Sequence, residues 1–192
     1  LMLATINKIN MKQLLTIILI ISFLTSFSQE FEHKEYYENG KVKVEYSGKK
    51  DTPNGIVKMY YPTGELQGDL MYKKGKQNGL SKIYYQSGKT QKEMTYKNGV
   101  QVDTMKIYFE TGKLQELSII LNGAKSGIYQ LYYENGQIQI DGFTKDNQLH
   151  GFCTHYNEDG KKSKEGEYKM GQPIGIWKEY NKIGVTQKNY GQ

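Results

Sequence analysis

Tyrosine recurs at a fixed interval of 24 residues along most of this 192-residue chain, and this repeat constrains the fold more than any other feature. The tyrosines that share the interval are Tyr36, Tyr60, Tyr84, Tyr108, Tyr132, Tyr156 and Tyr180. A glycine follows four residues after each of them. Self-similarity at a fixed period indicates an array of identical supersecondary units, and residues 33–192 hold six such units and a short seventh.

The segments between the glycines have the length and composition of β-strands. They are short runs rich in Tyr, Ile, Val and Met, and Asn39-Gly40 is the strongest short-range signal for a two-residue hairpin loop. Two further columns hold residue types that tolerate positive φ. These are Asp51, Gly75, Gly99, Gly123, Asn147 and Gly171, and Gly55, Gly79, Asp103, Gly127, Gly151 and Gly175. The sequence therefore predicts an all-β fold, an elongated single-sheet antiparallel meander of tandem 24-residue β-hairpins with about 13 strands.

A two-residue loop fixes the pairing register, and charge tests it. The register places Lys82 opposite Glu93, and Tyr84 opposite Gln91. The equivalent pairs in other repeats are Lys34 with Glu45, Lys58 with Asp69, Gln130 with Asp141 and Thr154 with Glu165, while Lys106 falls opposite Leu117. Three pairs of opposite charge support the register.

Alternation of side chains along each strand predicts two different faces. One face is apolar through the middle repeats, and it either closes on itself as a core or docks a partner. The candidate docking residues are Met105, Ile107, Phe109, Leu131 and Tyr133. The opposite face carries the Tyr, Gln, Lys and acid columns and is expected to be wet. Its candidate columns for a polymer such as a glycan, or for anionic lipid, are Lys58, Tyr60, Lys82, Tyr84, Lys106 and Tyr108; the alternative is a solvated cross-strand ladder.

The unit that runs from Tyr84-Tyr85 through Gly88-Lys89, Glu93 and Tyr96 to Asn98-Gly99 resembles the MORN-repeat-variant proteins of bacteria. The resemblance covers residues 29–192 and implies a scaffold for protein recruitment or lipid contact. Many such proteins are identified as antitoxin components of toxin-antitoxin systems. The Trp that usually follows the Glu is missing here, which argues against lipid binding by the mechanism of that family.

Residues 1–28 have the three parts of a secretory signal peptide. Lys8 and Lys12 precede an apolar stretch of 14 residues, Leu14 to Phe27, which is shorter than the about 20 residues a membrane-spanning helix needs. Cleavage is expected near Ser28/Gln29, and residues 1–10 are a possible upstream extension because Met11 begins the cleaner signal. The alternatives are a buried helix and an uncleaved anchor. The chain is therefore expected to be exported, to the periplasm, the envelope or the medium.

Charge and cysteine content exclude several classes of function. The net charge of +6 falls to +4 when the two lysines of residues 1–28 are removed (6 − 2), and all 26 basic residues are Lys. Specific nucleic-acid recognition is disfavoured because Arg is absent. Cys153 and His155 would share one face of a strand, but no third partner can be assigned, so neither a catalytic dyad nor a metal site is expected.

The sequence predicts a non-enzymatic exported repeat scaffold for protein-protein interaction, with no cofactor. One alternative is an antitoxin-like or immunity protein that neutralises a toxin. The other is binding of a membrane surface or cell-wall polymer through the Lys and Tyr columns. Salt separates the last from apolar docking, because polymer or lipid binding should collapse as ionic strength rises.

Overall fold

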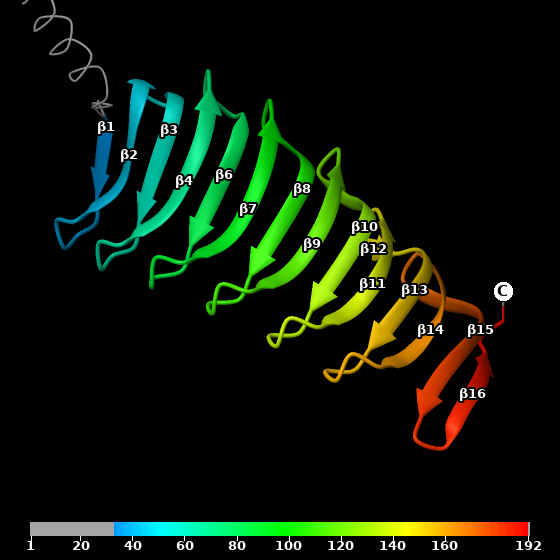
Figure 1. Ribbon diagram of the computed structural model, residues 1–192. Helices are drawn as coiled ribbons and strands as arrows, with labels where there is room; N and C mark the ends of the chain where they lie inside the picture. Colours follow the sequence, from blue (N-terminus) through cyan, green and yellow to red (C-terminus); the bar gives the residue numbers. More distant parts are fainter. Residues whose placement is uncertain (1–32, 192) are drawn as a thin grey trace, which may run out of the picture. The chain divides into compact units, whose positions relative to one another are not determined.

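A computed structural model describes residues 33–191, which fall within one compact unit, Glu32–Gln192. All regular structure in this part is β, in strands that pair antiparallel in one open sheet (Figure 1). The strands are β1 His33–Tyr36, β2 Val42–Lys49, β3 Thr52–Tyr60, β4 Leu66–Lys73, β5 Lys76–Gln77, β6 Gly79–Tyr84, β7 Thr90–Lys97, β8 Val100–Tyr108, β9 Leu114–Leu121, β10 Ala124–Tyr132, β11 Ile138–Lys145, β12 Gln148–Leu149, β13 Gly151–Tyr156, β14 Lys162–Lys169, β15 Gln172–Asn181 and β16 Gly184–Asn189. The predicted fold class is confirmed. The predicted signal peptide lies outside the described residues.

The strand count differs from the expected 13. Sixteen strands are present in residues 33–191. β5 and β12 are two-residue pieces separated from β6 and β13 by Asn78 and His150, and the count without them is 14 (16 − 2). At both places the backbone N–H of the separating residue donates to a carbonyl of the preceding strand, from Asn78 to Met71 and from His150 to Phe143. The pairing register shifts by two between the short piece and the longer strand, and both remain paired to the same neighbour.

The predicted charge register is confirmed. Lys34 pairs with Glu45, Lys58 with Asp69, and Lys82 with Glu93. Gln130 with Asp141, Thr154 with Glu165, and Lys106 with Leu117 also pair as predicted. The acids of these pairs also have partners in the strand on their other side, Glu45 with Lys58 and Glu93 with Lys106. One row of mostly charged side chains therefore crosses the sheet. We call it the charged row.

The predicted two-residue loop at Asn39-Gly40 is wrong. The N–H of Gly40 donates to the carbonyl of Tyr37 (2.9 Å), and the N–H of Tyr37 donates to the carbonyl of Lys41 (2.8 Å), which encloses three loop residues. Among the loop residues only Gly40 has positive φ (79°). This is a turn completed by a left-handed glycine, the usual three-residue hairpin loop. Five later hairpins repeat this pair of hydrogen bonds.

The predicted pairing of Tyr84 with Gln91 is also wrong. Ile83 pairs with Lys92, but Tyr84 pairs with Thr90, so Gln91 is an extra residue. Gln67, Gln115 and Gln139 are bypassed in the same way. The three-residue loop shifts the register by one, and a β-bulge at the Gln column shifts it back. This compensation explains why the charge pairs beyond the bulge keep the predicted register.

Two-residue turns occur at the other end of the strands. Asn98 (φ 52°) and Gly99 (φ 87°) connect the paired residues Lys97 and Val100, as a type I′ turn requires. Figure 1 shows these turns along one long edge of the sheet and the three-residue loops along the other. We call them the turn edge and the loop edge. The five later turns of this edge also hydrogen-bond to the preceding repeat, as Gly99 does to the carbonyl of Gln77 (2.8 Å).

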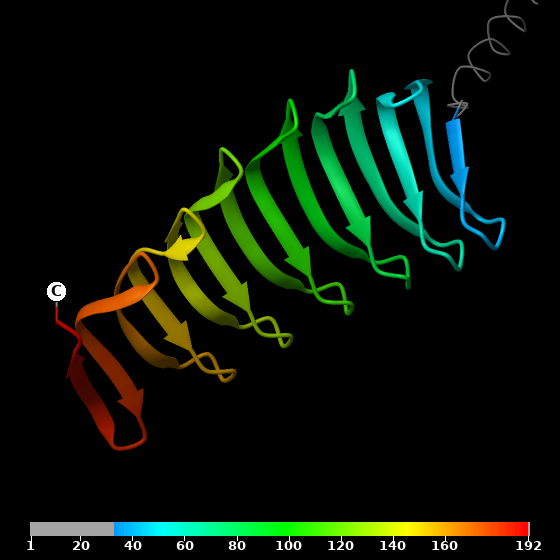
Figure 2. The same cartoon turned by 180° about the vertical axis from the view of Figure 1, so that it is seen from behind.

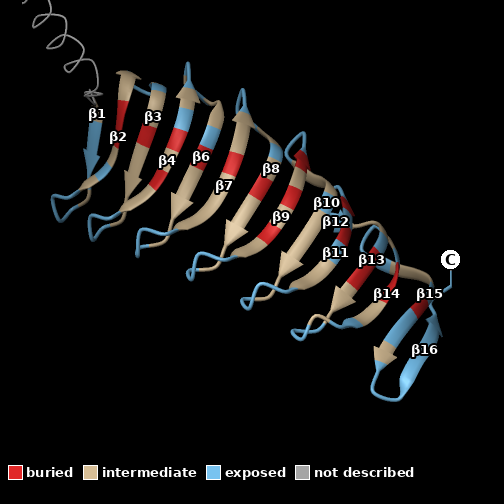
Figure 3. Ribbon diagram, viewed as in Figure 1, coloured by how far each residue is buried: buried red, intermediate tan, exposed pale blue. Residues whose placement is uncertain are grey.

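The core is a second row, on the face opposite the charged row. Its two buried clusters are Tyr46, Val57 and Leu70, and Met94, Met105 and Ile120. Figure 3 shows the buried residues in the middle of the strands, and the terminal strands β1 and β16 have none. The expected apolar face is therefore largely a core formed by neighbouring strands of the same sheet.

Side-chain volume is balanced between paired strands along this row. The buried indole of Trp177 lies opposite Gly166, and the buried Cys153 pairs with Gly166 on one side and packs against Gly142 on the other. Toward the N-terminus Tyr46 pairs with the smaller Val57. Such complementary pairs fill the row without a second layer of structure.

Candidate functional site

The predicted polymer-binding columns are engaged inside the sheet. The hydroxyls of Tyr60, Tyr84 and Tyr108 donate to the carboxylates of Glu45 (2.6 Å), Asp69 (3.1 Å) and Glu93 (3.1 Å). Each tyrosine thus reaches the acid 15 residues earlier, in the preceding repeat. Lys82 forms an ion pair with Glu93 (2.9 Å), and Lys58 and Lys106 pair with acids across the ladder.

The expectation that this face is wet is partly wrong. Glu45 and Glu165 are each only 9% exposed, because tyrosine and lysine side chains cover them. The hydrogen bond and charge of Lys82, with the hydrogen bond from Tyr108, hold the pKa of Glu93 below its usual range. Burial and the neighbouring Glu93 carboxylate raise the pKa of Tyr108. These shifts are typical of a self-satisfied ladder that stabilises the sheet.

The predicted docking residues occupy a less exposed position than a docking surface needs. Met105 is 4% exposed and belongs to the core. Ile107 packs against the same cluster, and Phe109 and Leu131 are half-buried. The hydroxyl of Tyr133 donates to the carbonyl of Tyr156 (2.9 Å), as Tyr37, Tyr61 and Tyr85 do to the equivalent carbonyls of their own next repeats. The docking role of these five residues stays a prediction.

A different set of apolar side chains is exposed, and sequence reasoning missed it. Ile128 and Phe143 are direct cross-strand partners and are 46% and 52% exposed. Phe152 (51%) and Ile176 (61%) occupy the equivalent positions of β13 and β15, two residues from the charged row toward the turn edge. Met71 and Leu80 hold the same positions in β4 and β6. We call these six residues the exposed apolar row.

The signal for this row was present in the sequence. Side chains two residues apart on a strand share a face, and Ile128 lies two residues before Gln130 of the charged row, as Phe152 does before Thr154. Assigning one face as apolar and the other as polar concealed them. The face is mixed, with a polar half toward the loop edge and an apolar half toward the turn edge.

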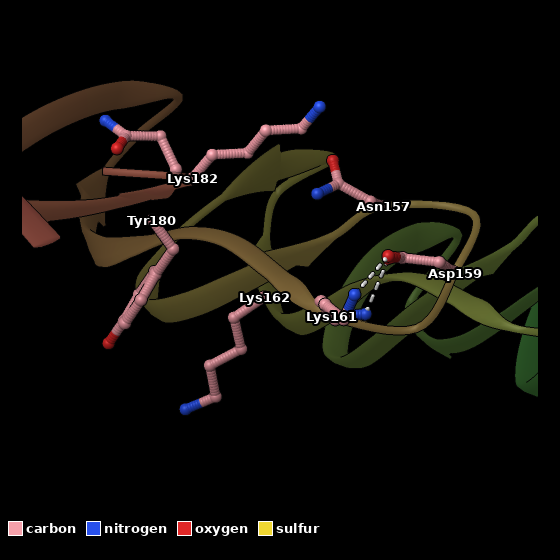
Figure 4. Close-up of a pocket in the computed structure, with 7 residues that line it drawn as sticks. Asn157, Asp159, Lys161, Lys162, Tyr180 and Lys182 are labelled. Atoms are coloured by element: carbon pink, nitrogen blue, oxygen red, sulfur yellow. Dashed lines mark hydrogen bonds and ion pairs between the residues drawn. The ribbon is translucent and has the colours of Figure 1, made fainter. Parts of the chain in front are cut away.

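A depression of about 600 Å³ lies between the last two loops of the loop edge, lined by Asn157, Asp159, Lys161, Lys162, Tyr180, Asn181 and Lys182 (Figure 4). Two of its three lysines have counter-ions close by. Lys161 pairs with Asp159 (3.1 Å), and Lys162 pairs with Glu165 (2.8 Å), which also accepts from the Tyr180 hydroxyl. Lys182 is the lysine of this lining that forms no ion pair over the described residues.

Cys153 and His155 lie on one face of β13 as predicted, with Sγ and Nε2 3.9 Å apart. Burial raises the pKa of the Cys153 thiol to about 11 and lowers the pKa of His155 to about 4. The thiol is 1% exposed, and the His155 ring lies beside Tyr168 and Trp177. Both shifts favour the neutral pair, whereas a nucleophilic dyad needs the thiolate. The His155 ring is half-buried.

Searches for two other kinds of site gave negative results over residues 33–191. In that range no group of three or more His, Cys, Asp or Glu side chains is arranged to hold a metal ion. No helix of the described chain is long and apolar enough to cross a membrane.

Comparison with known proteins identifies the repeat. A comparison with curated proteins gave no match. The matches to a family model start at positions separated by 24 or 48 residues, and they omit residues 101–122 and the residues after 146. In residues 101–122 Phe109 and Leu117 replace the usual Tyr and acid, but the strands continue. MORN repeats are generally associated with protein or membrane binding. Four segments of this chain, residues 29–50, 53–74, 77–98 and 125–146, match the model of the family described as MORN repeat variant.

Proposed function

We propose that this protein is an exported, non-enzymatic repeat scaffold that binds a partner protein through the exposed apolar row. The observation that carries the proposal is the exposure of Ile128, Phe143, Phe152 and Ile176, each between 46% and 61%, at equivalent positions of β10, β11, β13 and β15. Glu167 of β14 lies between the last two of them. Contiguous exposed apolar side chains mark interaction surfaces on soluble proteins. The partner chemistry that fits this row is an apolar surface.

The side chains of the core row and of the charged row already contact one another within the sheet, which favours the exposed apolar row as the binding surface. The core row is buried, and the charged row is joined by tyrosine hydroxyls and lysine ammonium groups. Phenylalanine at 143 and 152 is costly on a surface that binds nothing, because exposed aromatic rings favour aggregation and serve the fold little. Aromatic anchors are also the side chains that contribute most to protein-protein affinity.

Absence of catalysis is supported by the chemistry of the one sulfur-histidine pair. The thiol of Cys153 is buried, the half-buried ring of His155 lies beside Trp177 and Tyr168, and the shifted pKa values of both groups favour their neutral forms. Export is supported by the apolar stretch Leu14 to Phe27 behind Lys8 and Lys12. Neutralisation of a toxin, which the family resemblance implies, is one form of the same docking.

The test is site-specific photo-cross-linking in cells. A photoreactive phenylalanine analogue at Phe143 or Phe152 should give one discrete protein adduct, shared by both positions, that persists at high salt. The matched control positions are Ile183 (98% exposed) and Val185 (56% exposed), which are apolar and lie outside the row. A Ser substitution at the row position not carrying the analogue should abolish the adduct.

Two results would reject the proposal. Equal adducts at Ile183 and Phe152 would mean that exposure alone explains the reaction. Loss of the adduct at moderate salt would favour binding of a charged polymer or lipid instead. An adduct with the mass of two copies of this chain would identify self-association, and sedimentation of the purified protein would verify it.

A further inference from the structure

The turn that connects β4 and β5 concentrates positive charge without a counter-ion. Its residues are Lys73, Lys74, Gly75 and Lys76, and Lys73 is the direct cross-strand partner of Lys76. Like charges in directly opposed positions destabilise a hairpin. The other tight turns of the described chain carry at most two lysines, and none has this cross-strand lysine pair. We call this segment the lysine turn.

The lysine turn borders a depression. Its volume is about 400 Å³, and its lining consists of Lys73, Lys74, Lys76, Asn78 and Asn98. Over the described residues, none of these three lysines forms an ion pair, and all three are exposed. The lining thus has three cations, two amides and no carboxylate, whereas the depression of Figure 4 contains Asp159 and two lysines in ion pairs.

Hydrogen bonds hold the floor of this depression in place. The Asn78 side-chain oxygen accepts from the backbone N–H of Asn98 (3.2 Å), and the Asn54 oxygen accepts from the backbone N–H of Lys74 (3.2 Å). Because its oxygen is engaged, Asn78 presents its NH₂ group as a donor. The turn itself is fixed by left-handed Lys74 (φ 50°) and Gly75 (φ 77°).

The neighbouring turns extend the positive field. Lys49 and Lys50 precede the lysine turn by one repeat, and Lys97 follows it by one repeat. Asp51 is the one acid among these three turns, and it belongs to the first of them. A concave surface with charge of one sign raises the local concentration of ligands of the opposite sign.

We propose that this depression binds a compact, multiply charged phosphate compound, with the diphosphate group as the recognised unit. Three lysine ammonium groups and an amide donor match an anion of three to four negative charges, and lysine binds phosphate as a point charge. A volume of about 400 Å³ exceeds a single phosphate and lies at the lower end of small-ligand sites. The like-charge pair of Lys73 and Lys76 is then a cost to folding that the bound anion offsets.

The experiment is calorimetric titration of the purified protein with inorganic pyrophosphate at low ionic strength. We expect saturable binding with one site per chain. Lys74→Gln with Lys76→Gln should weaken it by about tenfold or more. The matched control is Lys145→Gln with Lys169→Gln, which removes the same charge from the same edge but leaves the lysine turn intact. All four side chains are exposed, and circular dichroism would verify that each variant is folded.

A second experiment distinguishes a lipid headgroup from a free compound as the source of the diphosphate group. Retention on neutral-lipid vesicles doped with a diphosphate-headgroup lipid, and release by added pyrophosphate, would identify a lipid; binding of pyrophosphate with no vesicle retention would identify a free compound. Equal weakening by both pairs of substitutions would overturn the proposal, because it would show that only net charge matters. Failure of pyrophosphate to saturate the protein would overturn it as well.

Discussion

The indole ring of Trp177 covers the backbone of Gly166 so closely that a methyl group at position 166 would overlap the ring. The two residues face each other across β14 and β15, and the ring also meets the edge of Tyr168 at 4.8 Å between centroids. The indole is 2% exposed although the sheet has one layer. A residue without a side chain is what allows this strand to bury the largest one.

Gly166→Ala should therefore destabilise the protein by about 3 kcal/mol, in the range of overpacking in a filled core. Urea unfolding at pH 7 measures the change. In a Trp177→Leu background the same alanine should cost much less, since the smaller side chain leaves room. The same cost in both backgrounds would show that the clash is not the cause.

Phe109→Tyr should stabilise the sheet. Tyr37, Tyr61, Tyr85 and Tyr133 each donate to the backbone carbonyl 23 residues later, and Phe109 occupies the same position without a hydroxyl. The added hydrogen bond to the Tyr132 carbonyl should contribute about 1 kcal/mol. Tyr85→Phe is the reverse control and should lose a similar amount in thermal unfolding. An unchanged midpoint for both variants would show that these hydroxyls do not stabilise the fold.

Met170→Asn should raise stability by about 1 kcal/mol. Met170 has φ 48° at the first position of a tight turn whose equivalents include Asn98 and Asn122. Asparagine tolerates this left-handed backbone, while methionine is strained there. Met170→Leu removes the sulfur but keeps the strain, so it should leave the unfolding free energy unchanged. Equal effects of Asn and Leu would indicate a packing change instead.

His155 should make the protein acid-sensitive between about pH 6.5 and pH 4. Its pKa is lowered to about 4 by burial and by the charge of Lys164, so the unfolded chain binds a proton in this range that the folded protein does not. Stability therefore falls as pH falls through that window. Urea unfolding at several pH values should show this slope in the parent and in His150→Gln, but not in His155→Phe. A slope that survives in His155→Phe would assign it to other groups.

Glu93 should make stability depend on pH in a lower range than His155 does. Its folded pKa is depressed by Lys82 and Tyr108, so its contribution is present above the unfolded value, about 4.3, and is lost as pH falls through the folded pKa. Glu93→Gln should lower the unfolding free energy at pH 7 by about 1–2 kcal/mol and at pH 2.5 by much less. Glu134→Gln, at an exposed loop position, is the control. A pH-independent cost would attribute the loss to packing.

The repeat period was enough to predict the fold class and the charge register, because a 24-residue interval leaves little freedom in how hairpins follow one another. The error at Asn39-Gly40 arose because the same dipeptide suits a two-residue turn and a three-residue loop that ends in a left-handed glycine. The bulge at Gln91 then restored the register, so charge pairing could not expose the mistake. The sequence of the loop alone does not predict that a β-bulge in the next strand reverses the register shift that the loop causes.

The candidate surfaces were harder to predict. Burial of Glu45 depends on Tyr60 reaching back one repeat, and burial of Met105 depends on Met94 and Ile120 in adjacent strands. Alternation alone assigned each side chain to a face but could not say which neighbours cover it. Exposure of Phe143 and Phe152 likewise follows from their place near the turn edge, where the described strands offer no cover.

Apart from the two-residue strands β5 and β12, which pair with β4 and β11 beside β6 and β13, every described strand pairs only with the strands next to it along the chain. A globular core has a fixed volume that its side chains must fill. This open sheet does not close on itself, so closure does not limit the number of its repeats. Insertion or deletion of one whole 24-residue repeat leaves each remaining strand paired with a strand of the same kind. The length of the molecule can therefore change in steps of about 10 Å, two strand spacings, without a new fold. Gene duplication within such a chain changes the length of the sheet by whole repeats.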